Sequence, residues 1–143
     1  MTTPDNDVFG RALLDWAMGG ILPEVLERED GFTQVGAGPD VYLSGFKGWP
    51  TAERKSIRYI RGRVMDIGCG AGRVALELQK RGVDVVGLDA SPLAAKAAKI
   101  RGLNNVWSMP IGVRPRTNEV LPNVGGNRIQ GAISRLGRLE NPL

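Results

Sequence analysis

The sequence predicts an α/β fold built on a parallel sheet, and three adjacent stretches carry this prediction. Two short apolar runs, at 64–67 and 83–88, suit strands that are buried on both faces of a sheet. Between them, apolar residues at helical spacing over 70–80 predict a helix that ends at Gly82. A strand, a helix and a second strand in this order form one βαβ unit.

The residues before this unit predict helices and one long loop. Apolar residues at helical spacing predict a helix over 7–18, and a proline in the first turn favours a second helix over 23–28. The segment 31–49 contains five glycines and is typical of a loop, with one short extended run at 41–43. A third helix over 50–60 leads into the first strand of the unit.

The residues after the unit predict one more helix and one more strand. Ser91 and Pro92 suit the cap and first residue of a helix that ends before Gly102. The segment 104–109 then fits a third parallel strand.

A turn with three glycines joins the first strand of the unit to its helix. Gly68, Gly70 and Gly72 allow the backbone to approach a ligand closely, and the start of the helix presents unpaired N–H groups to that ligand. Asp89 ends the second strand at the same edge of the sheet, where a carboxylate can accept hydrogen bonds from a ribose diol. This arrangement predicts a cofactor that contains a nucleoside.

The glycine pattern indicates which cofactor. It reads G-x-G-x-G, and Arg73 stands where the dinucleotide fingerprint G-x-G-x-x-G has its third glycine. With Asp66 inside the strand, the segment D-I-G-C-G-A-G-R closely resembles motif I of the class I S-adenosylmethionine-dependent methyltransferases, and Asp89 matches their ribose-binding acid. The resemblance covers about residues 40–110. It implies a Rossmann-like doubly wound parallel sheet of the class I methyltransferase type, incomplete after the third strand and preceded by N-terminal helices.

The resemblance also implies S-adenosylmethionine as the cofactor and assigns residues around it. The methionine side would be lined by Asp66, Gly68, Cys69, Gly70 and Gly72. The adenosine side would take Asp89 on the ribose, Ala90 and Ser91 beneath it, and Ser108 and Met109 near the adenine, where many family members carry an acid.

Two aromatic residues of the long loop are further candidates. Tyr42 and Trp49 could contact the cofactor or cover the substrate, because long loops with aromatic residues are commonly binding elements. The alternative is that these side chains pin the loop to the body of the protein.

The amino-acid composition excludes some kinds of catalytic and metal site. Histidine is absent, which excludes a histidine general base and the commonest zinc sites, so no metal is expected. Cys69 is the single cysteine, so no internal disulfide is possible. We interpret it as a small residue that fills a tight turn rather than as a nucleophile.

No apolar run approaches the roughly 20 residues of a membrane-spanning helix and no secretory signal is visible, which predicts a cytoplasmic protein without a membrane partner.

The net charge of +4 comes from the C-terminal part of the chain, since residues 1–100 carry equal numbers of acidic and basic side chains. A basic segment can bind nucleic acid, but beyond Trp107 it lacks aromatic residues that would stack on bases.

Three regions are predicted: N-terminal helices with a covering loop (1–50), an S-adenosylmethionine-binding core (51–112), and an atypical basic tail (113–143). The resemblance stops near residue 112, whereas a complete class I domain continues for about 100 further residues. A truncated gene product, a shifted reading frame and a fragment completed by another chain would each account for this. The unpaired edge of the shortened sheet predicts a homodimer.

The predicted activity is methyl transfer from the cofactor sulfonium to a small-molecule acceptor, and the absence of the C-terminal half could leave the chain inactive. No residue can be assigned as a catalytic base. Two alternatives stay open: a fragment of an NAD(P)-type oxidoreductase that uses the same unit, or a nonenzymatic fragment that binds cofactor or another protein.

Overall fold

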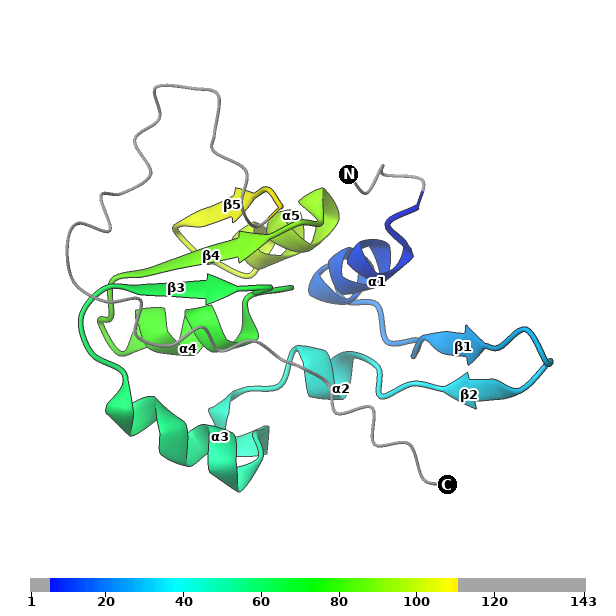
Figure 1. Cartoon of the computed structure of the whole chain (residues 1–143), viewed down its shortest axis with the longest axis horizontal. Helices are drawn as coiled ribbons and strands as arrows, with labels where there is room; N and C mark the ends of the chain where they lie inside the picture. Colours follow the sequence, from blue (N-terminus) through cyan, green and yellow to red (C-terminus); the bar gives the residue numbers. More distant parts are fainter. Residues whose placement is uncertain (1–5, 111–143) are drawn as a thin grey trace.

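The computed structural model describes residues 6–110, which form a small parallel sheet, surrounding helices and a separate hairpin (Figure 1). The α-helices are α1 (Val8–Ala17), α2 (Pro39–Tyr42), α3 (Thr51–Ser56), α4 (Arg73–Lys80) and α5 (Pro92–Ile100), and the 3-10 turns are η1 (Phe46–Gly48) and η2 (Ile57–Tyr59). The strands are β1 (Val25–Glu27), β2 (Thr33–Val35), β3 (Val64–Ile67), β4 (Val85–Asp89) and β5 (Val106–Ser108). The predicted tail, 113–143, lies outside the described residues.

The larger sheet has the order β3-β4-β5, and both pairings are parallel. In the register, Ile67 lies opposite Leu88, and Asp89 lies opposite Ser108. The carboxyl ends of all three strands therefore meet at one edge of the sheet. The α/β class and the parallel βαβ unit predicted from the sequence are confirmed.

Helices α4 and α5 complete a common hydrophobic core with the strands. Ala75 and Leu78 of α4 and Ala98 of α5 belong to the same buried cluster as Val64 and Val85 of the sheet. Helix α4 begins three residues later than predicted, at Arg73, and its C-terminal end is as the sequence predicts. Val83 donates its N–H to the carbonyl of Leu78 at 3.0 Å, which closes α4 after Gly82 in a left-handed conformation, φ +77°.

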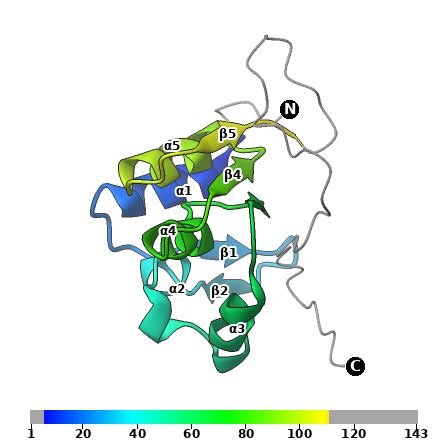
Figure 2. The ribbon, with the colours of Figure 1, turned by 90° about the vertical axis from the view of Figure 1, so that its left-hand side faces the viewer.

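The N-terminal helix α1 is confirmed, and it packs along α5 (Figure 2). A second buried cluster joins the two helices through Leu13 and Trp16 of α1 and Ala94 and Ala97 of α5. Small alanine side chains on α5 let the larger side chains of α1 approach closely. The amino end of α1 thereby reaches the carboxyl edge of the sheet.

Two predictions for the N-terminal region are wrong. The segment 23–28 is not a helix, because its residues 25–27 form strand β1 and pair antiparallel with β2 across a turn. Gly31 adopts φ +81° in that turn, and the hairpin is closed by the N–H of Arg28 on the carbonyl of Phe32 at 2.8 Å. The run 41–43 is not extended, because Pro39 begins the short helix α2 with a φ already suited to a first turn.

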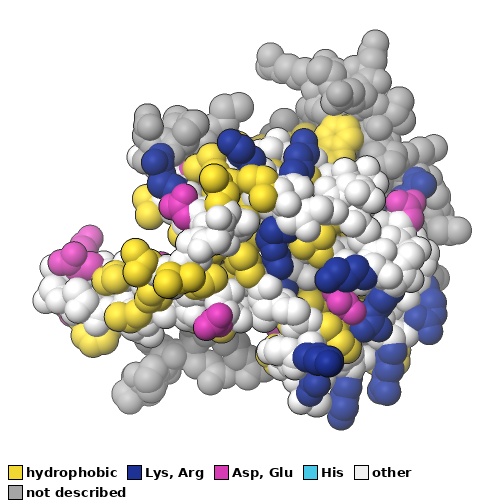
Figure 3. All heavy atoms as spheres, turned by 180° about the vertical axis from the view of Figure 1, so that it is seen from behind, with side chains coloured by type: hydrophobic (Ala, Val, Ile, Leu, Met, Phe, Trp, Pro, Cys, Tyr) yellow, Lys and Arg dark blue, Asp and Glu magenta, His cyan; other side chains and the backbone are white. Residues whose placement is uncertain are grey.

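The hairpin projects from the body of the protein (Figure 1), and its hydrophobic side chains are visible on the rear face (Figure 3). Val25, Leu26 and Val35 are all more than half exposed. Within residues 6–110, no helix is long and apolar enough to cross a membrane.

Candidate functional site

The glycine turn between β3 and α4 is left-handed at three positions, with φ of +71° at Gly68, +55° at Gly70 and +76° at Gly72. The first and last of these glycines have different surroundings. A Cβ added at Gly68 would meet no atom within 4 Å, whereas one added at Gly72 would lie 3.2 Å from the Cβ of Ala98. Gly72 therefore allows α4 to pack closely on α5, and Gly68 leaves its side of the turn open to a ligand.

Asp66 orients the start of α4 from the neighbouring strand. Its side chain is buried, and its Oδ2 accepts a hydrogen bond from the N–H of Ala75 at 3.1 Å. The residue at the N-cap position is Gly72, which has no side chain to accept this bond. The Asp66 carboxylate takes over that role, and its negative charge suits the positive end of the helix.

Asp89 is joined directly to the glycine turn. Its Oδ2 accepts the N–H of Gly70 at 2.8 Å, and its Oδ1 accepts the N–H of Ser91 at 2.9 Å. A carboxylate offers about four lone-pair positions. Each oxygen of Asp89 therefore keeps the capacity to accept another hydrogen bond, at the point where β4 ends.

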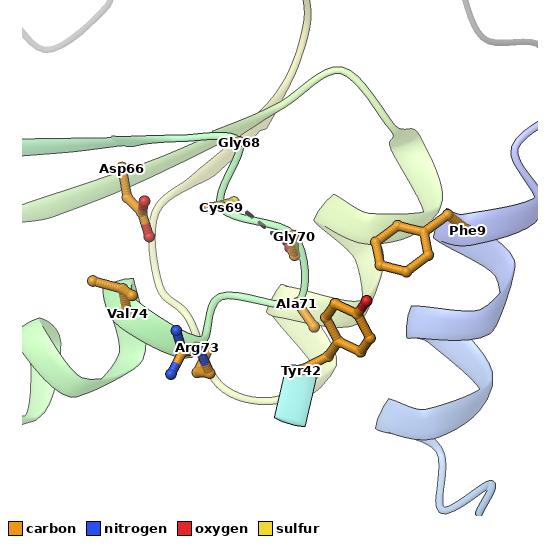
Figure 4. A pocket seen from close by; sticks show the side chains of 9 residues that line it. All are labelled: Phe9, Tyr42, Asp66, Gly68, Cys69, Gly70, Ala71, Arg73 and Val74. Atoms are coloured by element: carbon orange, nitrogen blue, oxygen red, sulfur yellow. Dashed lines mark hydrogen bonds between the residues drawn. The ribbon is translucent and has the colours of Figure 1, made fainter. Parts of the chain in front are cut away.

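A cavity of about 240 Å³ lies beside the glycine turn (Figure 4). Its lining comprises Phe9, Tyr42, Asp66, Gly68, Cys69, Gly70, Ala71, Arg73 and Val74. Tyr42, Asp66, Gly68, Cys69 and Gly70 are among the predicted site residues. The other four, Phe9, Ala71, Arg73 and Val74, are not, because no local pattern assigns their side chains to a cofactor.

The aromatic wall of this cavity comes from two elements that are distant in the sequence. The rings of Phe9 and Tyr42 meet edge to face at 5.1 Å, and Tyr42 stacks on Trp16 at 5.5 Å. Figure 4 shows Phe9 and Tyr42 facing each other next to Ala71. The helical spacing of Phe9 and Trp16 was visible in the sequence, but it could not show that Phe9 borders a cavity.

Arg73 connects the cavity with the buried core. Its side chain is 6% exposed, it forms an ion pair with Glu53 at 2.6 Å, and its guanidinium lies 4.6 Å from the ring centre of Trp49. Trp49 is itself buried and does not line the cavity. The structure therefore places Trp49 beneath Arg73 as a supporting side chain, in line with the alternative that this aromatic residue pins the loop.

Cys69 lies within the turn with its side chain buried. Burial raises the pKa of the thiol, and the neighbouring carboxylates of Asp66 and Asp89 raise it further. The thiol therefore stays protonated at neutral pH, which makes it a poor nucleophile. It fills space instead, because a Cβ at Gly87 of β4 would lie 2.9 Å from its Sγ.

The other predicted residues gather at the carboxyl edge of the sheet, next to Asp89. Ser91 caps α5 by accepting the N–H of Ala94 at 2.8 Å, and Ala90 is exposed beside it. Ser108 is exposed, and the N–H of Met109 donates to the Asp89 carbonyl at 2.8 Å. These residues, like Asp89 itself, are not part of the cavity lining.

Part of the chain is similar in sequence to known methyltransferases. Residues 64–113 match the sequence model described as a methyltransferase domain. The chain is 49% identical over 51 residues to a 2-heptyl-1-hydroxyquinolin-4(1H)-one methyltransferase of Mycobacteroides abscessus, covering 33% of this chain and 22% of that protein. It is 39% identical over 79 residues to a ubiquinone biosynthesis O-methyltransferase of Alkalilimnicola ehrlichii, covering 55% of this chain and 31% of that protein. The chain thus spans less than a third of the length of these relatives.

The fold is also found among solved structures. A methyltransferase of Bacteroides fragilis, crystallised with S-adenosyl-L-homocysteine, superimposes with a TM-score of 0.65 at 24% identity. The match covers 74% of this chain and 44% of that one. The resemblance predicted from D-I-G-C-G-A-G-R is thereby confirmed: residues 64–113 match a methyltransferase domain, and the chain shares its fold with a solved methyltransferase.

Proposed function

We propose that this chain binds S-adenosylmethionine and serves methyl transfer from that cofactor to a small-molecule acceptor. The observation that carries the proposal is the hydrogen bond from the Gly70 N–H to the Asp89 carboxylate at 2.8 Å. It brings the two halves of the family motif, the glycine turn and the acid after the second strand, to the same point.

The residues around this point fit the cofactor. The open side of Gly68 leaves room that a side chain would fill, and the cavity of about 240 Å³ continues from it. The Asp89 carboxylate would accept the ribose hydroxyls with the lone pairs that remain after its two backbone bonds. The methionine portion would lie along Gly68 and Gly70, opposite the rings of Phe9 and Tyr42. Ala90, Ser91, Ser108 and Met109 would then border the adenosine.

In this proposal the chain positions the cofactor and shields it from water, and it contributes little acid or base chemistry. When bound, S-adenosylmethionine supplies an electrophilic methyl group, whose bond to sulfur breaks as a lone pair of the acceptor bonds to the methyl carbon. Phe9 and Tyr42 would keep water from the methionine side of the cavity. Because the chain has no histidine, a proton released by the acceptor must pass to a carboxylate, a tyrosine, a lysine or water.

A small molecule is the acceptor class that the relatives favour. The name of one relative specifies 2-heptyl-1-hydroxyquinolin-4(1H)-one, and the name of the other specifies ubiquinone biosynthesis. This chain spans only part of each relative, so the acceptor is a proposal and not a property carried over from them.

A second copy of the chain is the macromolecular partner that we propose. Within residues 6–110, β3 is paired on one side only, by β4. An unpaired edge offers N–H and carbonyl groups to another strand. Sedimentation equilibrium at several concentrations tests this proposal, and a concentration-independent monomer would refute it.

Calorimetric titration with S-adenosylhomocysteine and with NAD tests the cofactor proposal. We expect S-adenosylhomocysteine to bind and NAD to give no signal, because the turn lacks the third glycine beneath a pyrophosphate. Binding of NAD alone would favour the oxidoreductase alternative. Transfer of labelled methyl from S-adenosylmethionine to a small-molecule extract then tests turnover, and binding without transfer would favour a nonenzymatic cofactor-binding fragment.

A further inference from the structure

Arg101, the residue that follows α5, connects two segments of the cofactor site. Its Nη1 donates to the carbonyl of Ala71 at 2.8 Å, and its Nη2 donates to the carbonyl of Leu43 at 2.9 Å. Ala71 belongs to the glycine turn, and Leu43 is the residue that ends α2. One guanidinium therefore bonds the turn and the end of α2 at the same time.

The position of α2 determines where Tyr42 lies. This helix has only four residues, its N-cap is a glycine, and no side chain caps its first turn. Such a short helix has little stability of its own and depends on tertiary contacts. Tyr42, which lines the cavity, directly precedes the carbonyl that Arg101 holds.

The electrostatic setting of Arg101 suits this bridging role. None of the ion pairs found within residues 6–110 involves Arg101, although its side chain is half-buried. Burial lowers the pKa of Arg101, and the nearby cation of Arg73 lowers it further, but an arginine remains charged in proteins. The two carbonyls are thus the groups that replace water around this cation, and the planar guanidinium can reach both where a lysine ammonium offers no matching pair of donors.

We propose that Arg101 is a positioning residue that holds α2 against the glycine turn and so fixes the Tyr42 wall of the cofactor pocket. This inference rests on the proposed function, because it assigns the wall to the methionine side of S-adenosylmethionine. Arg101 touches neither the cavity nor a reacting atom, and it acts through Ala71 and Leu43.

The test compares Arg101→Met and Arg101→Lys with Lys99→Met in the full chain. Lys99 is exposed in the last turn of α5, so its loss removes the same charge from the same helix end without breaking either bond. Calorimetry would use S-adenosylhomocysteine and methylthioadenosine, which lacks the amino-acid portion. We expect Arg101→Met to lower the affinity for S-adenosylhomocysteine about tenfold, because one or two charged hydrogen bonds are lost. The affinity for methylthioadenosine should change much less.

Arg101→Lys and Lys99→Met distinguish a positioning role of Arg101 from a general loss of stability. Arg101→Lys should recover only part of the affinity, and Lys99→Met should match wild type. The inference would be overturned if Arg101→Met lowered the affinity for both ligands equally, or if that variant kept wild-type affinity for S-adenosylhomocysteine.

Amide hydrogen exchange without ligand provides a test that does not depend on the cofactor. Arg101→Met or Arg101→Lys should speed exchange over 40–48 and leave 11–17 of α1 unchanged. Unchanged exchange over 40–48 would overturn the positioning role even if neither ligand binds. Failure of wild type to bind either ligand, with faster exchange in the variants, would instead refute the proposed function and leave the bridge itself supported.

Discussion

Asp7 and Ser91, 84 positions apart in the chain, cap two different helices and hydrogen-bond to each other. Asp7 accepts the N–H of Gly10 at 3.0 Å at the start of α1, and Ser91 accepts the N–H of Ala94 at 2.8 Å at the start of α5. The Ser91 hydroxyl donates to the Asp7 carboxylate, while the Ser91 N–H donates to Asp89. A continuous series of bonds thus runs from the N-terminal helix to the acid of the cofactor site.

Replacing Asp7 with alanine should destabilise the protein. The change removes a helix cap and leaves the Ser91 hydroxyl without its acceptor, so we expect a loss of about 1 to 3 kcal/mol. Urea denaturation followed by tryptophan fluorescence measures it. Asp15→Ala is the control, because Asp15 is an exposed acid of the same helix, and its effect should stay within about 0.5 kcal/mol. Equal effects of the two changes would contradict the cap.

Asp89→Ala should weaken S-adenosylhomocysteine binding more than it weakens the fold. Each charge-assisted bond to the ribose is expected to contribute at most about 1.5 to 3 kcal/mol. Calorimetry of wild type and variant gives the difference in binding free energy. Asp84→Ala provides the matched comparison, since Asp84 is an exposed carboxylate just before β4 whose partner is Arg63. Wild-type affinity in Asp89→Ala would exclude the ribose role.

Glu53→Gln should cost more stability than Glu77→Gln. The first change leaves the buried guanidinium of Arg73 without a counter-charge, which costs about 3 kcal/mol or less because Glu53 itself is 37% exposed. The second change breaks an i,i+4 pair with Arg81 worth about 0.3 to 0.5 kcal/mol. Thermal and urea unfolding of both variants test this ranking. A reversed order would mean that the Arg73 ion pair contributes little.

The thiol of Cys69 should resist alkylation in the folded protein. Burial raises its pKa above the ordinary value of 9.0, so iodoacetamide at pH 8 should modify the unfolded chain and spare the native one. Above pH 9 the unfolded thiol loses its proton while the native thiol keeps it, so stability should fall as pH rises through this range. Cys69→Ala should remove that part of the pH dependence, and an unchanged slope would contradict the shift.

Much of the core could be predicted because its signals are local. The apolar runs of β3 and β4, the glycines of the turn and the Ser91-Pro92 start of α5 each specify a backbone conformation within a few residues. The hairpin at 25–35 was missed because its strands are three residues long and exposed, so neither helical nor alternating periodicity reveals them. Such short strands form only because they pair with each other.

By itself, the sequence determined the strand, glycine turn, helix and strand that carry Asp66 and Asp89, since these depend on spacing and on residues that favour particular backbone angles. Tertiary structure alone decided which side chains meet at the turn. Arg73 bonds to Glu53, 20 positions away in the sequence, and Arg101 bonds to Leu43, 58 positions away. Ser91 bonds to Asp7, 84 positions away. A local pattern cannot specify such contacts, because they arise only when packing brings separate elements to the same edge of the sheet.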